Sequence, residues 1–142
     1  MRYLGLDLGT KTLGVAVTDK SNILASPLKT IRFSSEDYYA PIEELKKIIA
    51  EYKITEVILG NPINMDGSRG FASDRSMKFK KILEENIDLP ITLIDERLSS
   101  IEAHNILSTN GKKEIKHKEN VDAVAASLIL ESFLKRKEND HA

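Results

Sequence analysis

Acidic residues interrupt three apolar stretches of this chain. Asp7 lies between two leucines in LGLDLG, Asp95 and Glu96 close ITLIDE, and Asp122 precedes the run AVAASLIL. Burying an ionised carboxylate among apolar residues is costly unless another group compensates its charge. These acids are therefore the first candidates for a site that does chemistry.

Each acid also has an ordinary structural explanation. Asp7 precedes Gly9-Thr10, and aspartate at such a turn often accepts a hydrogen bond from a backbone amide. Asp95 and Glu96 stand where a strand ends and becomes exposed. Asp122 falls in the first turn of an expected helix, where the helix dipole favours a carboxylate.

Two features favour a shared site over these separate explanations. Strand alternation puts Gly5 and Gly9 on the same face as Asp7, which predicts an open space beside its carboxylate. Small residues three and four positions after Asp122 place that acid on the helix face that packs against a sheet. We therefore expect Asp7 and Asp122 to converge.

Converging carboxylates point to a divalent cation, because such acids repel one another and resist ionisation. Alternation sends Asp95 and Glu96 to opposite faces, so only one of them joins Asp7, and parity alone does not say which. Oxygen ligands without cysteine or paired histidine favour Mg²⁺ or Mn²⁺. Two such ions about 4 Å apart clamp the attacking and leaving oxygens of a phosphoryl centre.

Basic residues gather near these acids, although the formal net charge of the chain is only −1. Local positive charge beside carboxylates is what a phosphate-backbone groove requires, and a solvated charged loop is the plainer alternative. The candidate substrate contacts are Lys11, Arg97, Lys112, Lys113, Lys116 and Lys118. The Asn64–Gly70 loop is either a cover for substrate or a plain connector, and Arg75 after it is assigned only surface charge.

Composition indicates one domain in a reducing compartment. The chain has 142 residues, 41% of them hydrophobic, and no cysteine. No apolar run approaches a membrane span, and MRYLGLDLG is too short and polar for a signal peptide. We expect a single domain over residues 1–136, a polar tail over 137–142, and a cytoplasmic location.

The order of elements predicts an α/β fold. Strands are expected at 2–8, 12–18, 22–32, 56–62 and 90–97, and helices from Pro41, up to Asn86, from Ser99 to Asn110 and from about Asn120. This order gives a five-stranded mixed sheet, with three antiparallel strands followed by two parallel ones. Helices should cover both faces of the sheet.

Four motifs in this order resemble the YqgF (RuvX) family, bacterial proteins with the ribonuclease H-like fold of the RuvC resolvase. They are Asp7-x-Gly9-Thr10-Lys11 with Gly14-Val15-Ala16, Gly60-x-Pro62 with Asp66-Gly67, Asp95-Glu96-Arg97, and Val121-Asp122-Ala123-Val124-Ala125-Ala126. The resemblance implies that Asp7, Glu96 and Asp122 bind the metals, with Asp95 in a supporting role. One departure is Thr12, where relatives often carry Arg or Lys.

The function implied is a metal-dependent nuclease that matures the 5′ end of pre-16S ribosomal RNA. Asp7 would bridge two ions, with Glu96 and Asp122 each holding one. A Holliday junction resolvase acting on branched DNA and a non-catalytic nucleic-acid-binding module are the alternatives. The residues are compatible with RNA or branched DNA and with a monomer or a homodimer. An actin-like ATPase is disfavoured, because it needs a second domain to close over the nucleotide.

Overall fold

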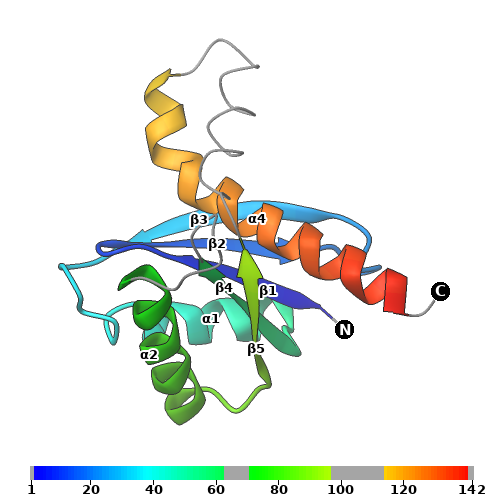
Figure 1. The fold of residues 1–142 in the computed structure, drawn as a ribbon, viewed down its shortest axis with the longest axis horizontal. Coiled ribbons are helices and arrows are strands. Elements are labelled where there is room, and N and C mark those ends of the chain that lie inside the picture. The colour runs from blue at the N-terminus through cyan, green and yellow to red at the C-terminus, as the bar shows by residue number, and fades with distance from the viewer. Residues whose placement is uncertain (1, 63–70, 97–113, 141–142) are drawn as a thin grey trace.

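A five-stranded sheet with helices on both faces forms the protein (Figure 1). The computed structural model describes residues 2–62, 71–96 and 114–140. The elements are β1 (Tyr3–Leu8), β2 (Thr12–Thr18), β3 (Ala25–Arg32), α1 (Ile42–Tyr52), β4 (Glu56–Pro62), α2 (Phe71–Asn86), β5 (Ile91–Glu96) and α4 (Glu114–Asp140).

The sheet has the strand order β3-β2-β1-β4-β5. Strands β1, β2 and β3 pair antiparallel, whereas β4 pairs parallel with β1 and β5 pairs parallel with β4. This confirms the predicted mixed sheet. The carboxyl ends of β1, β4 and β5 therefore lie at the same edge, which is where open α/β sheets form their sites.

Two apolar layers hold the helices to the sheet. Helices α1 and α2 pack on the face that carries Leu4 and Leu6, and α4 packs on the opposite face with Tyr3. Figure 1 shows α4 above the sheet and α1 and α2 below it. Because β4 is covered on both faces, Val57, Ile58 and Leu59 are all fully buried, as its continuous apolar run predicts.

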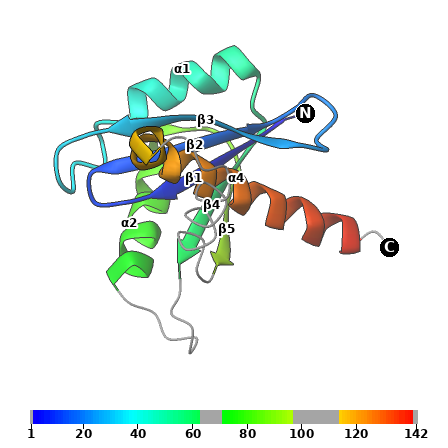
Figure 2. The same cartoon turned by 90° about the horizontal axis from the view of Figure 1, so that it is seen from above.

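Helix α4 approaches the sheet at backbone distance because three strands carry glycine beneath it. A methyl group at Gly14 of β2 would overlap the backbone carbonyl of Asp122. One at Gly5 of β1 would overlap Leu130, and one at Gly60 of β4 would overlap Ile129. Figure 2 shows α4 running across the strands, and these contacts explain how it can lie so close.

The glycines on the strand of Asp7 do not leave the open space that alternation suggests. Leu130 and the backbone of α4 occupy the position above Gly5. Gly9 belongs to the turn after β1, where its amide donates to the carbonyl of Thr12 at 2.7 Å. The prediction of an opening at Gly5 and Gly9 is therefore wrong, since helix packing and a tight turn use those positions.

The observed element ends differ from the predicted ones in two places. Strand β3 starts at Ala25 rather than at 22, because Asp19 closes a turn by accepting from the amides of Ile23 and Leu24 at 2.8 and 3.2 Å. Helix α4 starts at Glu114 rather than near Asn120, since no glycine or proline interrupts residues 114–120.

The end of α4 also differs from the expected polar tail. The helix continues to Asp140, and Lys137 donates a 2.6 Å hydrogen bond to the hydroxyl of Tyr3 on β1. This contact ties the last turns of α4 to the sheet. The helix expected over residues 99–110 and Arg97 lie outside the described residues. No helix in the described part of the chain is long and apolar enough to cross a membrane.

The close seating of α4 makes Gly14 harder to replace than Gly60. We expect Gly14→Ala to lower the free energy of unfolding by about 3 kcal/mol, because the added methyl meets backbone that cannot rotate away. Gly60→Ala should cost about 1 kcal/mol, because the end of the Ile129 side chain can move. Urea unfolding of both variants measures this, and equal losses would contradict the explanation.

Candidate functional site

Asp7 lies near the carboxyl end of β1, on the face covered by α4. Its partner on β2 is Gly14, and on β4 it stands one residue beyond the Leu6–Leu59 pair, which brings it level with Gly60. Both lateral neighbours of Asp7 therefore lack side chains. The carboxylate is partly buried between them, under the helix.

Helix α4 brings Asp122 to the same place. Its backbone carbonyl lies over Gly14, the cross-strand partner of Asp7, and its side chain is partly buried. Ala126, Ile129 and Leu130 continue the same helix face into the core, with exposures of 0%, 1% and 0%. The predicted placement of Asp122 on the sheet-facing side of its helix is confirmed.

The helix dipole does not explain Asp122. Because α4 begins at Glu114, Asp122 lies two turns inside the helix rather than in its first turn. The favourable interaction of a carboxylate with a helix N-terminus fades within the first turn. The position of Asp122 is therefore set by packing against β2, and its charge needs another partner.

Asp7 and Asp122 form an under-compensated acidic pair. Burial, followed by the nearby charge of Asp122, raises the pKa of Asp7 from its ordinary 3.8 to about 7, and Arg75 opposes this rise. A site in which carboxylates resist ionisation gains stability from a bound cation. Carboxylate oxygens are the ligands that Mg²⁺ and Mn²⁺ prefer, so the two acids fit such an ion.

Arg75 was interpreted from sequence as a surface charge, and this was wrong. It is partly buried on α2, its charge acts on Asp7, and it hydrogen bonds to the side chain of Tyr38. Tyr38 is only 4% exposed, and burial raises the pKa of its hydroxyl. The sequence offers no clear signal for this, because the two residues meet only when α2 folds beneath the sheet.

Asp95 faces the other side of the sheet from Asp7. Its carboxylate accepts a hydrogen bond from the Asn61 amide at 2.8 Å, and the Asn61 carbonyl oxygen accepts one from Ser73 of α2 at 2.8 Å. Asn61 is 2% exposed, so this chain of polar contacts is well shielded. Asp95 thus links the ends of β4 and β5 to α2 and does not share the face of Asp7 and Asp122.

Glu96 is the last residue of β5 and pairs with Pro62 at the end of β4. Its side chain lies outside the described residues. In the described part of the chain, no three acidic, histidine or cysteine side chains gather into a metal site. The described part of the predicted site is therefore the pair Asp7 and Asp122.

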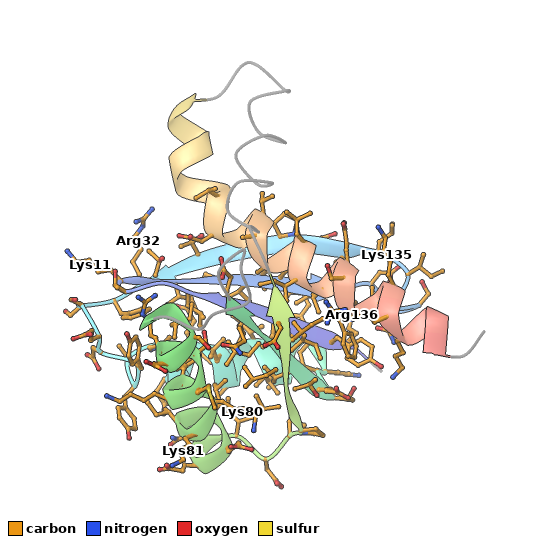
Figure 3. All side chains as sticks on the ribbon, viewed as in Figure 1. Lys11, Arg32, Lys80, Lys81, Lys135 and Arg136 are labelled. Atoms are coloured by element: carbon orange, nitrogen blue, oxygen red, sulfur yellow. The ribbon has the colours of Figure 1, made fainter. Side chains whose placement is uncertain are left out.

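Of the predicted substrate contacts, Lys11 has a described side chain. It is exposed in the turn after β1, and Arg32, which the sequence analysis did not select, pairs with the neighbouring Thr12 from β3. Figure 3 shows both cations at the same end of the sheet. Lys116 and Lys118 lie in the first turns of α4 with side chains outside the described residues, and Arg97, Lys112, Lys113 and the Asn64–Gly70 loop lie outside them entirely.

Known proteins share this sequence over nearly its whole length. A relative from Geobacillus sp. (strain WCH70) is 42% identical over 138 residues, which cover 97% of this chain and 100% of the relative. One from Clostridium kluyveri is 43% identical over 136 residues, which cover 96% and 98%. Both carry the name "Putative pre-16S rRNA nuclease".

Solved structures share the fold. RuvC of T. thermophilus in complex with a Holliday junction substrate superposes with a TM-score of 0.56 at 14% identity, covering 96% of each chain. A fowlpox virus resolvase bound to Holliday junction DNA gives a TM-score of 0.53 at 16% identity, covering 96% of this chain and 98% of that one. With the observed strand order, these neighbours confirm the ribonuclease H-like fold.

The family model described as "RuvX: Holliday junction resolvase" matches residues 1–136. This range contains all four motifs on which the predicted resemblance rests, and the relatives align across them. The resemblance is confirmed: this chain belongs to the RuvX family.

Proposed function

We propose that this chain is a divalent-metal-dependent nuclease that processes the 5′ end of pre-16S ribosomal RNA. The observation that carries the proposal is the pairing of Asp7 and Asp122, which come from opposite ends of the chain and share one poorly compensated site. The names of the full-length relatives support the choice of RNA as substrate.

Glu96 completes the ligand set in this proposal. Asp95 is bound to Asn61 on the α2 side of β5, and alternation gives the next position to the α4 side. That is the face of Asp7 and Asp122. Asp7, Glu96 and Asp122 would hold the metal, with Asp7 shared between two ions, and Asp95 would support the end of β5.

The chemistry proposed is hydrolysis of a phosphodiester bond by in-line attack of water. When bound, the ions supply charge stabilisation for the attacking and leaving oxygens. The chain supplies the rest: Asp7 and Asp122 fix the reacting edge of the sheet, and Lys11 is placed to contact flanking phosphates. Arg97, Lys112, Lys113, Lys116 and Lys118 are the further phosphate contacts proposed from sequence.

A Holliday junction resolvase is the second candidate, and the description of the matching family and the junction-bound structural neighbours favour it. A resolvase cuts two strands and therefore also predicts a homodimer. Purified protein with Mg²⁺ or Mn²⁺ should be compared on single-stranded RNA, a four-way DNA junction and ATP. RNA cleavage supports the proposal, preferential junction cleavage favours the resolvase, and tight binding without cleavage favours a binding module.

Replacing Asp7 should remove cleavage without unfolding the protein. We expect Asp7→Asn to abolish Mg²⁺-dependent cleavage of single-stranded RNA, because the shared carboxylate is lost while the side-chain volume is kept. Asp95→Asn is the matched control: it makes the same chemical change on the other face and keeps an oxygen to accept from Asn61. It should retain most activity. Cleavage by Asp7→Asn at the wild-type rate would refute the proposed mechanism.

Metal-free stability should depend on pH through Asp7. An acid whose pKa is higher folded than unfolded binds protons more readily in the folded state, so stability falls as pH rises from about 3.8 to about 7. At pH 8 in EDTA, Asp7→Asn should therefore be more stable than wild type by about 2–4 kcal/mol, and the difference should shrink at pH 4.5.

Thermal unfolding across this pH range measures the effect. Mg²⁺ should raise the melting temperature of wild type at pH 8 and have little effect on Asp7→Asn, since the variant lacks the shared ligand. Identical pH profiles for the two proteins would show that Asp7 is not the strained group.

A further inference from the structure

We propose that Arg75, held in place by the hydroxyl of Tyr38, contacts a phosphate of the nucleic acid beside Asp7. The inference deepens the proposed function and rests on it. It adds a substrate-binding residue from α2, on the opposite side of the sheet from α4, to a site otherwise built from β1, β5 and α4.

Tyr38 is a rigid anchor for Arg75. Its ring packs edge-on against Phe33 and Phe79, with ring centroids 6.0 and 6.2 Å away. Tyr38 is 4% exposed and Phe79 is fully buried. Phe79 follows Arg75 by four residues on α2, so both lie on the same helix face. The aromatic cluster therefore fixes both the helix that carries Arg75 and the hydroxyl that bonds to it.

Arg75 keeps most of its hydrogen-bonding capacity free for a ligand. A guanidinium carries five N–H donors, and the contact described for Arg75 is the one to Tyr38. In the described part of the chain it forms no ion pair, yet its charge acts on Asp7. The two groups are thus close without touching, and their opposite charges face a shared space.

This arrangement suits a phosphate better than it suits a structural ion pair. A planar guanidinium binds two phosphate oxygens at once, and a partly buried one is already desolvated. A direct Arg75–Asp7 pair would instead occupy the carboxylate that the proposal assigns to metal. With Lys11 at the end of β1, Arg75 would place positive charge on two sides of Asp7.

Other cations of α2 lack these features. Lys80 pairs with Glu84 one turn further along, at 3.0 Å. Lys81 is exposed, and Figure 3 shows it toward the end of α2 away from the sheet edge that carries Lys11. Lys81→Ala therefore removes the same unit of charge from the same helix without touching the site, which makes it the matched control.

The test compares Arg75→Ala, Arg75→Lys, Tyr38→Phe and Lys81→Ala. Binding of a single-stranded RNA oligonucleotide is measured by fluorescence anisotropy with Mg²⁺ in an Asp7→Asn background, where no cleavage should occur. The kcat and KM of cleavage are measured with Asp7 intact. Melting temperatures report whether each variant is folded.

We expect Arg75→Ala to weaken RNA binding and raise KM by about 10- to 100-fold, the range for a hydrogen bond to a charged group. The dependence of log Kd on log salt concentration should become shallower by about 0.7, the value for one phosphate contact on a single strand. Arg75→Lys should recover part of the loss as a point charge. Lys81→Ala should stay within about twofold of wild type.

Tyr38→Phe separates a held arginine from a free one. It keeps the ring contacts and removes the hydroxyl, so it should weaken binding in the same direction by a smaller factor. That effect should vanish in the Arg75→Ala background, because the two residues act as one unit.

Two outcomes would overturn the inference. In the first, Arg75→Ala binds and cleaves like Lys81→Ala. In the second, Arg75→Ala lowers the melting temperature with Kd and KM unchanged, which would mean that Arg75 only satisfies the Tyr38 hydroxyl. Wild-type cleavage in either case keeps the proposed function intact, whereas wild-type protein that neither binds nor cleaves RNA refutes both proposals.

Discussion

The close seating of α4 on the sheet is the contact on which the rest of the site depends. A helix with ordinary side chains beneath it lies too far from the strands for its backbone to reach them. Here glycine on β2, β1 and β4 lets the carbonyl of Asp122 rest over Gly14 and lets Leu130 and Ile129 fill the places above Gly5 and Gly60. One packing arrangement thus buries the α4 layer of the core and delivers an acid to Asp7.

This seating has an electrostatic consequence. Asp7 lies level with glycines on both neighbouring strands, so no adjacent side chain on the sheet compensates its charge, and Asp122 adds a second negative charge. Arg75 opposes the repulsion from beneath but does not remove it, since the pKa of Asp7 still rises to about 7. A pair of acids held in this way is costly without a cation, and that cost is the physical basis for the proposed metal site.

The face beneath the sheet supports the site without belonging to it. The contacts from Ser73 through Asn61 to Asp95 link α2 to the ends of β4 and β5, and the Tyr38–Phe79 cluster fixes α2 against the segment before α1. Both arrangements meet near the carboxyl edge of the parallel strands. They hold the edge in shape, while α4 and β1 provide the acids.

Much of this could be predicted from sequence, because it depends on local pattern. Alternation, apolar runs and helical spacing predicted the mixed sheet and the face of α4 that carries Asp122, and the motifs predicted the family. Two local interpretations were wrong. Gly5 accommodates Leu130 rather than leaving space, and Asp122 lies inside a longer helix, because spacing along one segment does not show what packs against it.

The sequence by itself determined which residue types alternate, which strands pair and which acids stand in apolar segments, since these follow from periodicity along the chain. The tertiary structure decided which of those residues meet. It put Asp95 with Asn61 beneath the sheet, brought Arg75 to Tyr38 and Asp7, and set Asp122 over Gly14. These contacts join segments far apart in the chain, and their distances depend on how closely whole helices can approach the sheet.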